Sequence, residues 1–132
     1  MAQEPTYAIL LRKAAESFAG AESEFAGDRF QNCANRCYYA CFFAAVYALR
    51  AAGTQPAGRQ DAWSHTFVQA QFAGQLIGRF KRYPAGLRDT LSRTFILRRT
   101  ADYTLDEVSQ MQASRAVDRA RTFVAAIKDG PR

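Results

Sequence analysis

The segment from Asp28 to about Ala52 constrains the fold more than any other part of the sequence. It begins with apolar residues on one side and becomes apolar on almost every side after Cys37. A helix that is hydrophobic all round has to be surrounded by other helices. Its many alanines favour helix and let neighbouring backbones approach closely. We therefore expect this segment to be the central helix of a bundle, with Asp28 as N-cap after a break at Gly27.

Other long helices are expected to surround the central one. The chain has no alternating strand pattern, no hairpin dipeptide and no internal repeat, so helices are the regular elements it can form. The sequence predicts an all-α fold, an up-and-down bundle of four long helices plus a short one, in a single domain over residues 1–132. Loops are expected over 53–62 and 74–84. The remaining helices are expected over 6–26, with a bend at Gly20, over 64–74 with Ser64 as N-cap, over 84–102, and over 104–128 with Thr104 and Glu107 as a capping box.

The net charge of +6 belongs to one part of the chain. Between Arg79 and Arg99 lie seven basic residues and one acid, whereas the rest of the chain holds eleven of each. Six of the seven are arginines, which suit bidentate contacts to phosphate. The segment predicts a polyanion partner, nucleic acid first, and the alternative is a solvated basic face without a ligand. The phosphate-binding candidates are Arg79, Lys81, Arg82 and Arg99.

Basic and aromatic residues alternate from Arg79 to Tyr83. Such a segment could bind a phosphate backbone and stack a base. The alternative is that Phe80 and Tyr83 anchor the segment to the core.

The three cysteines, Cys33, Cys37 and Cys41, share one face of the expected central helix. The outer two would lie about 12 Å apart along the axis, too far for one zinc ion to bind all three. Disulfides along one helix are poorly directed, so we expect buried packing thiols and neither metal nor cofactor. No apolar run could span a bilayer and no secretion signal is evident, so a cytoplasmic location without membrane contact is expected.

The helix expected over 84–102 has an apolar stripe that ends in two polar residues. Leu87, Leu91, Phe95, Arg98 and Asp102 fall on one helical face. A cation and a carboxylate are rare on a buried face unless they are paired or functional. Two interpretations stay open. Either Arg98 and Asp102 pair with each other where the stripe meets solvent, or the stripe docks a partner surface and delivers Arg98 to a polar site.

His65, the single histidine, stands at a predicted helix start. A structural role is the commoner one for such a residue. Acid–base work is the alternative, because the unperturbed pKa of imidazole lies near physiological pH. His65 is therefore an auxiliary site candidate.

With these elements placed, the sequence resembles the HEPN family (higher eukaryote and prokaryote nucleotide-binding domain), and among its members the small stand-alone prokaryotic proteins. Three features, in the expected order over nearly the whole chain, carry the resemblance. They are Asp28-Arg29-Phe30 leading to Tyr38-Tyr39-Ala40, Ser64-His65 followed by Phe72, and Arg98 to Tyr103 before a last helix that ends Phe123-Val124-Ala125-Ala126-Ile127.

The resemblance implies a helical bundle that forms a homodimer through the 84–103 helix, with a composite site where the two motifs meet. Active HEPN members are metal-independent endoribonucleases. Many are toxins of toxin–antitoxin pairs beside a nucleotidyltransferase, or effectors of antiviral defence. The resemblance thus implies RNA or a nucleotide as ligand and a nucleotidyltransferase as a candidate partner protein.

The family motif consists of an Arg, a polar residue, a short spacer and a His. Arg98 matches the Arg, Tyr103 stands where the His of the four-residue-spacer form would be, and Arg99 replaces a neutral or acidic residue. Cleavage through the 2′-hydroxyl needs two proton transfers and charge stabilisation at phosphate. Arg98 and Arg99 can supply the charge. A tyrosine is a poor base at neutral pH, and pairing with Arg98 would weaken Asp102 as a base.

The catalytic candidates are therefore Arg98, Asp102 and Tyr103, and three hypotheses stay open. One is a dimeric endoribonuclease with these residues around the scissile phosphate. Another is a non-catalytic module that binds RNA or nucleotide, or docks a partner protein. The third is a structural dimer in which the Arg98–Asp102 pair fixes the register.

Overall fold

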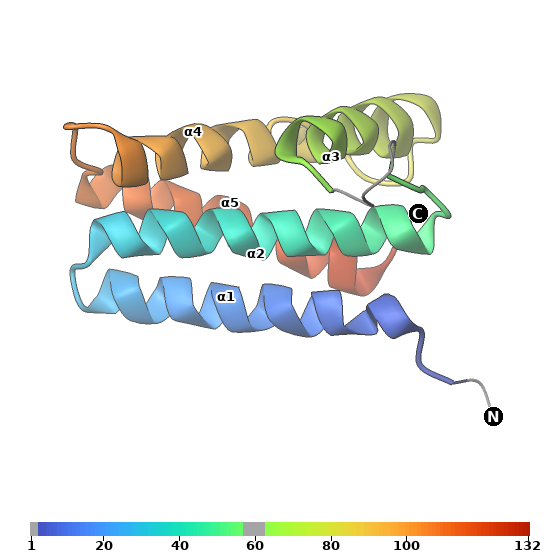
Figure 1. Cartoon of the computed structure of the whole chain (residues 1–132), viewed down its shortest axis with the longest axis horizontal. Helices are drawn as coiled ribbons and strands as arrows, with labels where there is room; N and C mark the ends of the chain where they lie inside the picture. The colour runs from blue at the N-terminus through green and yellow to red at the C-terminus, as the bar shows by residue number, and fades with distance from the viewer. Residues whose placement is uncertain (1–2, 57–62) are drawn as a thin grey trace.

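The computed structural model describes residues 3–56 and 63–132, and the regular elements in these ranges are all helices (Figure 1). The all-α bundle predicted from the sequence is confirmed. Of the predicted loop over 53–62, residues 57–62 lie outside the described residues. The elements are η1 (Thr6–Ala8), α1 (Ile9–Ala26), α2 (Phe30–Ala51), α3 (His65–Gln71), η2 (Phe72–Arg79), η3 (Ala85–Leu87), α4 (Thr90–Tyr103) and α5 (Gln110–Asp129).

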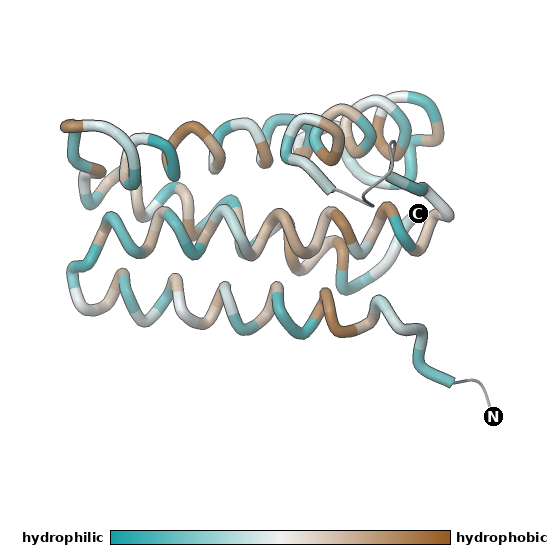
Figure 2. The backbone as a smooth tube through the Cα atoms, in the orientation of Figure 1, coloured by the Kyte–Doolittle hydropathy of each residue, from teal (hydrophilic) through white to brown (hydrophobic). Residues whose placement is uncertain are grey.

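Helix α2 is the centre of the bundle, as its composition predicts. Helices α1 and α4 flank it on opposite sides and α5 crosses behind it (Figure 1), and its second half is the more hydrophobic (Figure 2). Half of its residues are buried, and they include five alanines whose small side chains allow close packing. Cys33, Cys37 and Cys41 are free thiols with no exposed surface, so their predicted packing role is confirmed.

The first turn of α2 differs from the expectation. Asp28 is not the N-cap: its φ of 61° is left-handed, and Arg29 takes the N-cap position without a side-chain cap. Aspartate tolerates this conformation better than most residues, and here it closes the tight turn after α1. Helix α1 continues through Gly20 without a break.

Helix α5 begins later than predicted, because a different capping box starts it. The Ser109 hydroxyl accepts from the Gln112 backbone N–H (3.1 Å), and the Gln112 side chain accepts from the Ser109 N–H (2.9 Å). Thr104 instead follows the end of α4 and donates its hydroxyl proton to the Thr100 carbonyl (2.8 Å). The predicted capping box of Thr104 and Glu107 is therefore wrong.

A tertiary contact explains this shift. Gln31 on α2 accepts from the Val108 N–H (2.9 Å) and donates to the Val108 carbonyl (3.2 Å). Both backbone groups of Val108 are thereby withdrawn from a helix, and the segment before Ser109 is not helical. On the helix that follows, Met111 is 63% exposed and Phe123 is fully buried.

The helix that begins with α3 is longer than predicted. Ser64 is its N-cap and accepts from the Phe67 N–H (3.1 Å), as expected. The chain then continues through the π-helical element η2 to Arg79, past Gly74. Phe72 and Leu76 on η2 are buried, and this apolar packing outweighs the helix-weakening glycine.

Helix α4 starts at Thr90, after the short η3 turn, and its apolar stripe packs inward. Leu87 and Leu91 are 5% and 2% exposed within this single chain. They belong to the chain's own core and cannot form the dimer seam expected for them. None of the described helices is long and apolar enough to cross a membrane.

Candidate functional site

Arg98 on α4 lies among three tyrosine rings. Its guanidinium carbon is 5.5 Å from the ring centroid of Tyr38, 5.2 Å from that of Tyr39 and 5.5 Å from that of Tyr103. These are cation–π distances. The Arg98 side chain is 17% exposed, so the cation is largely removed from water without being sealed off.

The polar contacts of Arg98 are few for so buried a cation. Its Nε atom is buried and lies 3.3 Å from Asp102 Oδ2, an ion pair without hydrogen-bond geometry. Nη2 donates to the Tyr103 hydroxyl (3.3 Å). A guanidinium has five N–H donors, and that is the one hydrogen bond it donates within the described residues. Donors therefore remain for an anion.

Asp102 is held in place from α2. Asn35 Nδ2 donates to Asp102 Oδ2 (2.9 Å). The Asn35 side-chain oxygen, Oδ1, in turn accepts from Arg36 Nε (3.0 Å) and Nη2 (2.6 Å). This chain of contacts ties α2 to α4 and points the carboxylate at Arg98. The predicted pairing of Arg98 with Asp102 at i, i+4 is present, with Asn35 as an additional partner.

His65, at the first position of α3, lies against the same tyrosine as Arg98. Its Nδ1 is 3.2 Å from the Tyr38 hydroxyl. Its ring stacks on Phe95 of α4, with the centroids 3.7 Å apart and the planes at 12°. A bond from Gln69 Nε2 to the Ser92 hydroxyl (2.7 Å) also ties α3 to α4. We call Tyr38, His65, Arg98 and Asp102 the Arg98 cluster.

The environment shifts two pKa values in this cluster. Burial, and then the positive charge of Arg98, lower the pKa of His65 below its ordinary value of 6.5. Burial raises the pKa of Tyr38 to about 12, and Arg98 opposes that rise. At neutral pH the cluster therefore holds a neutral imidazole beside a neutral phenol.

The remaining α4 candidates are solvent-facing. Tyr103 is 67% exposed, although its hydroxyl reaches Arg98. Arg99 is exposed and points away from the cluster, a quarter turn further round the helix. Ile96, at 64% exposure, lies on the same outer side of α4.

The loop arginines lie in a different region. Arg79 and Arg82 place their guanidinium groups over the half-exposed ring of Phe80, 5.0 and 5.6 Å from its centroid. Tyr83 is buried and stacks on Phe72, with centroids 5.6 Å apart. The anchoring role is therefore confirmed for Tyr83 but not for Phe80, and nucleic-acid binding by this segment stays a prediction.

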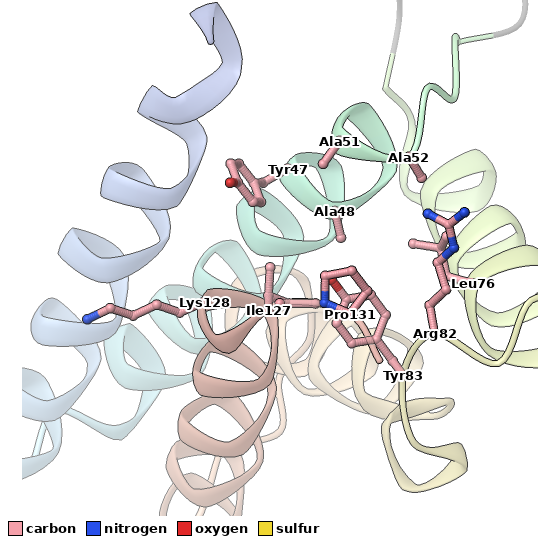
Figure 3. Close-up of a pocket in the computed structure, with 11 residues that line it drawn as sticks. Tyr47, Ala48, Ala51, Ala52, Leu76, Arg82, Tyr83, Ile127, Lys128 and Pro131 are labelled. Carbon is pink, nitrogen blue, oxygen red and sulfur yellow. The ribbon is translucent and has the colours of Figure 1, made fainter. Parts of the chain in front are cut away.

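Arg82 also borders a hollow of about 130 Å³ at the C-terminal end of α2. Figure 3 shows the Arg82 guanidinium directed toward Ala52, while the Lys128 side chain points away from the hollow. Arg98 lies over Tyr38, ten or more residues earlier on α2, which is about 15–20 Å along the helix. The structure therefore does not bring Arg79, Lys81 and Arg82 together with the Arg98 cluster. The hollow is lined by Tyr47, Ala48, Ala51, Ala52, Leu76, Arg82, Tyr83, Ile127, Lys128, Gly130 and Pro131.

Sequence reasoning missed the contribution of α2 to the site. Asn35, Tyr38 and Tyr39 lie on consecutive turns of α2 and all face α4 or α3. The available signal was a set of polar and phenolic side chains on a helix that is otherwise apolar, since buried hydroxyls and amides need partners. Within residues 3–56 and 63–132, no three His, Cys, Asp or Glu side chains gather as a metal-ligand set.

The fold and this cluster together define a class: a helical bundle whose central helix supplies tyrosines to an arginine-centred polar site. The family model of the HEPN domain matches residues 7–130, nearly the whole chain. The protein belongs to the HEPN family. A search of curated proteins finds no match.

Proposed function

We propose that this HEPN protein is a metal-independent endoribonuclease in which Arg98 stabilises the charge that develops on the scissile phosphate. The observation that carries the proposal is that the Arg98 guanidinium is held in place but has N–H donors without a hydrogen-bond partner among the described residues. Three rings and Asp102 hold it in place, while most of its N–H donors stay uncommitted. A preorganised cation in a place of low water content stabilises transition-state charge more strongly than a mobile surface arginine.

The other α4 candidates support Arg98 in this proposal. Asp102 orients the guanidinium through its ion pair and is itself oriented by Asn35. Tyr103 presents a hydroxyl beside Arg98 and can donate a hydrogen bond or a proton to the same phosphate. Bound RNA would reach the cluster at the C-terminal end of α4, where Tyr103 is exposed.

The proposed dimer uses the outer face of α4. Leu87 and Leu91 are buried in the core, so the contact would be made around Ile96, which is 64% exposed, and would leave Tyr103 open to RNA. Such a contact places the two Arg98 clusters near one twofold axis. A toxin–antitoxin or defence role with a nucleotidyltransferase partner belongs to the same proposal and rests on family membership alone.

The test is RNA cleavage in EDTA by the wild-type protein, Arg98→Ala and Tyr103→Phe, with solution mass measured on the same samples. The proposal predicts cleavage by the wild type, loss in Arg98→Ala and a smaller loss in Tyr103→Phe. Intact RNA after long incubation with folded wild-type protein would refute it.

A non-catalytic module is the second candidate, and one observation favours it. The motif position that holds a histidine in active members holds Tyr103 here, largely exposed. In that case the same cluster binds a nucleotide or an RNA phosphate without cleaving it. Retention of labelled RNA by the wild type and weaker retention by Arg98→Ala, with no cleavage by either, would identify this function.

A further inference from the structure

We propose that His65 is the general base of the Arg98 cluster and accepts the proton of the attacking 2′-hydroxyl. The motif on α4 has no histidine, and His65 on α3 would take over that role. The inference rests on the proposed ribonuclease function and deepens it by naming the group that moves the proton.

The position of His65 beside Arg98 favours this role. The two residues come from different helices but lie against one ring, that of Tyr38. The imidazole centroid is 5.7 Å from the Tyr38 centroid and the Arg98 guanidinium carbon is 5.5 Å from it. The charge of Arg98 is close enough to lower the pKa of His65. A phosphate bound by Arg98 would therefore bring its neighbouring ribose to the imidazole.

The imidazole ring is also held in one orientation. The Tyr38 hydroxyl lies 3.2 Å from Nδ1, and stacking on Phe95 at 3.7 Å fixes the plane of the ring. We assign this hydrogen bond as Nδ1–H donating to the Tyr38 oxygen. Nε2 then carries the free lone pair, on a side chain that is partly exposed. A base held by a hydroxyl at one nitrogen and free at the other is the arrangement that general-base histidines use.

The surroundings of His65 keep its ring neutral. The groups facing it are Tyr38 on α2, Arg98 on α4 and the uncharged ring of Phe95, and on α3 itself the helix N-terminus. Burial, Arg98 and a helix N-terminus all disfavour the imidazolium. His65 is thus able to accept a proton at neutral pH. Asp102 is less suited, because Asn35 and Arg98 both contact the same carboxylate oxygen.

Two proton transfers accompany the exchange of bonds at phosphorus. The 2′-O–H bond breaks and its proton passes to His65 Nε2, while the 2′-oxygen bonds to phosphorus and the P–O5′ bond breaks. The leaving 5′-oxygen takes a proton from the Tyr103 hydroxyl, which recovers one from solvent, and His65 later releases its proton to solvent. The products are a 2′,3′-cyclic phosphate and a 5′-hydroxyl end.

The experiment measures RNA cleavage in EDTA, as kcat and KM from pH 5 to 8, for the wild type, His65→Asn, Tyr38→Phe and Thr66→Ala. Thr66 is the exposed neighbour of His65 on the same turn and serves as the matched control. We expect His65→Asn to lose about 10²-fold or more in kcat with little change in KM. The wild type is expected to lose kcat as pH falls below 6.5, and this acid limb of the pH profile should be absent from His65→Asn. Tyr38→Phe should retain that limb with lower kcat, and Thr66→Ala should match the wild type.

A folding defect is separated from a chemical one by adding imidazole to His65→Ala. Recovery of cleavage, together with a melting curve near that of the wild type, supports the base assignment. The inference alone is overturned if the wild type cleaves and Arg98→Ala does not, but folded His65→Asn keeps both its kcat and its acid limb. If the wild type leaves RNA intact, the ribonuclease proposal falls and this inference falls with it.

Discussion

Arginines lie over aromatic rings in several places in this molecule, and two of these regions differ in burial and in the partners of the arginine. Arg98 is 17% exposed, lies among three tyrosines and has a carboxylate partner. Arg79 and Arg82 are exposed and share the single ring of Phe80. The first arrangement holds one cation between two helices, α2 and α4, and the second leaves two cations in solvent.

The difference shows that density of charge along the chain does not indicate where an arginine is buried among partners. The basic segment from Arg79 to Arg99 looks continuous in sequence. In the bundle, η3 and the first turns of α4 separate the two ends of this segment. Arg82 therefore lies near the C-terminal end of α2, whereas Arg98 lies near Tyr38 in the first half of that helix. A catalytic cation has to be preorganised, whereas a cation that attracts RNA acts at longer range and needs no fixed geometry.

The largest expected contrast is between Arg98→Ala and Arg82→Ala. Loss of a preorganised donor costs about 10²–10³-fold in kcat, so Arg98→Ala should lose nearly all cleavage, while Arg82→Ala should keep kcat within about threefold. Initial rates at saturating RNA measure both. Comparable losses of kcat in the two variants would show that the distinction between the regions is wrong.

A smaller effect is expected from Asn35→Ala. This change removes the hydrogen bond that positions Asp102 against Arg98. One hydrogen bond contributes about 1 kcal/mol, so kcat should fall about fivefold with KM nearly unchanged. Asn32→Ala is the control, since Asn32 is exposed on the same helix and contacts Glu24. An unchanged kcat in Asn35→Ala would mean that Asp102 needs no support from α2.

Arg79 and Arg82 should contribute to RNA binding and not to the rate of cleavage. In the double variant Arg79→Ala with Arg82→Ala, the slope of log K against log salt for RNA binding should fall by about 1 for each phosphate that the protein no longer neutralises. Cleavage of bound RNA should stay at the wild-type rate. Filter binding at low and at moderate salt tests this, and an unchanged slope would remove both arginines from the RNA-binding surface.

The smallest expected effect is on stability. The pKa of His65 is lowered below 6.5 in the folded chain, so the unfolded chain binds this proton more readily. The His65 contribution to folding is therefore fully present above about pH 6.5 and is lost as pH falls below that value. The melting temperature of the wild type should drop more between pH 7.5 and 5.5 than that of His65→Asn. Parallel curves would contradict the shifted pKa.

The local elements and the central position of α2 were predictable, because they depend on short-range patterns. An all-round apolar segment must be surrounded, and the N-cap at Ser64 was predicted correctly from the local pattern, although the N-cap predicted at Asp28 was not. The start of α5 was not predictable in this way. The box predicted at Thr104 does not form, and Gln31, more than seventy residues away, binds both backbone groups of Val108 just before the box that forms at Ser109.

The sequence by itself determined that this protein is a helical bundle with buried thiols, and that Arg98 and Asp102 share a helix face, since i, i+4 spacing and hydrophobic periodicity need no partner. Only the tertiary structure decided what Arg98 meets. Packing of α3 and α4 on α2 brings Asn35, Tyr38 and His65 to it, and the same packing leaves Arg79 and Arg82 at the other end of the bundle. Such assembly depends on where helices cross, a property of long-range packing that no local pattern encodes.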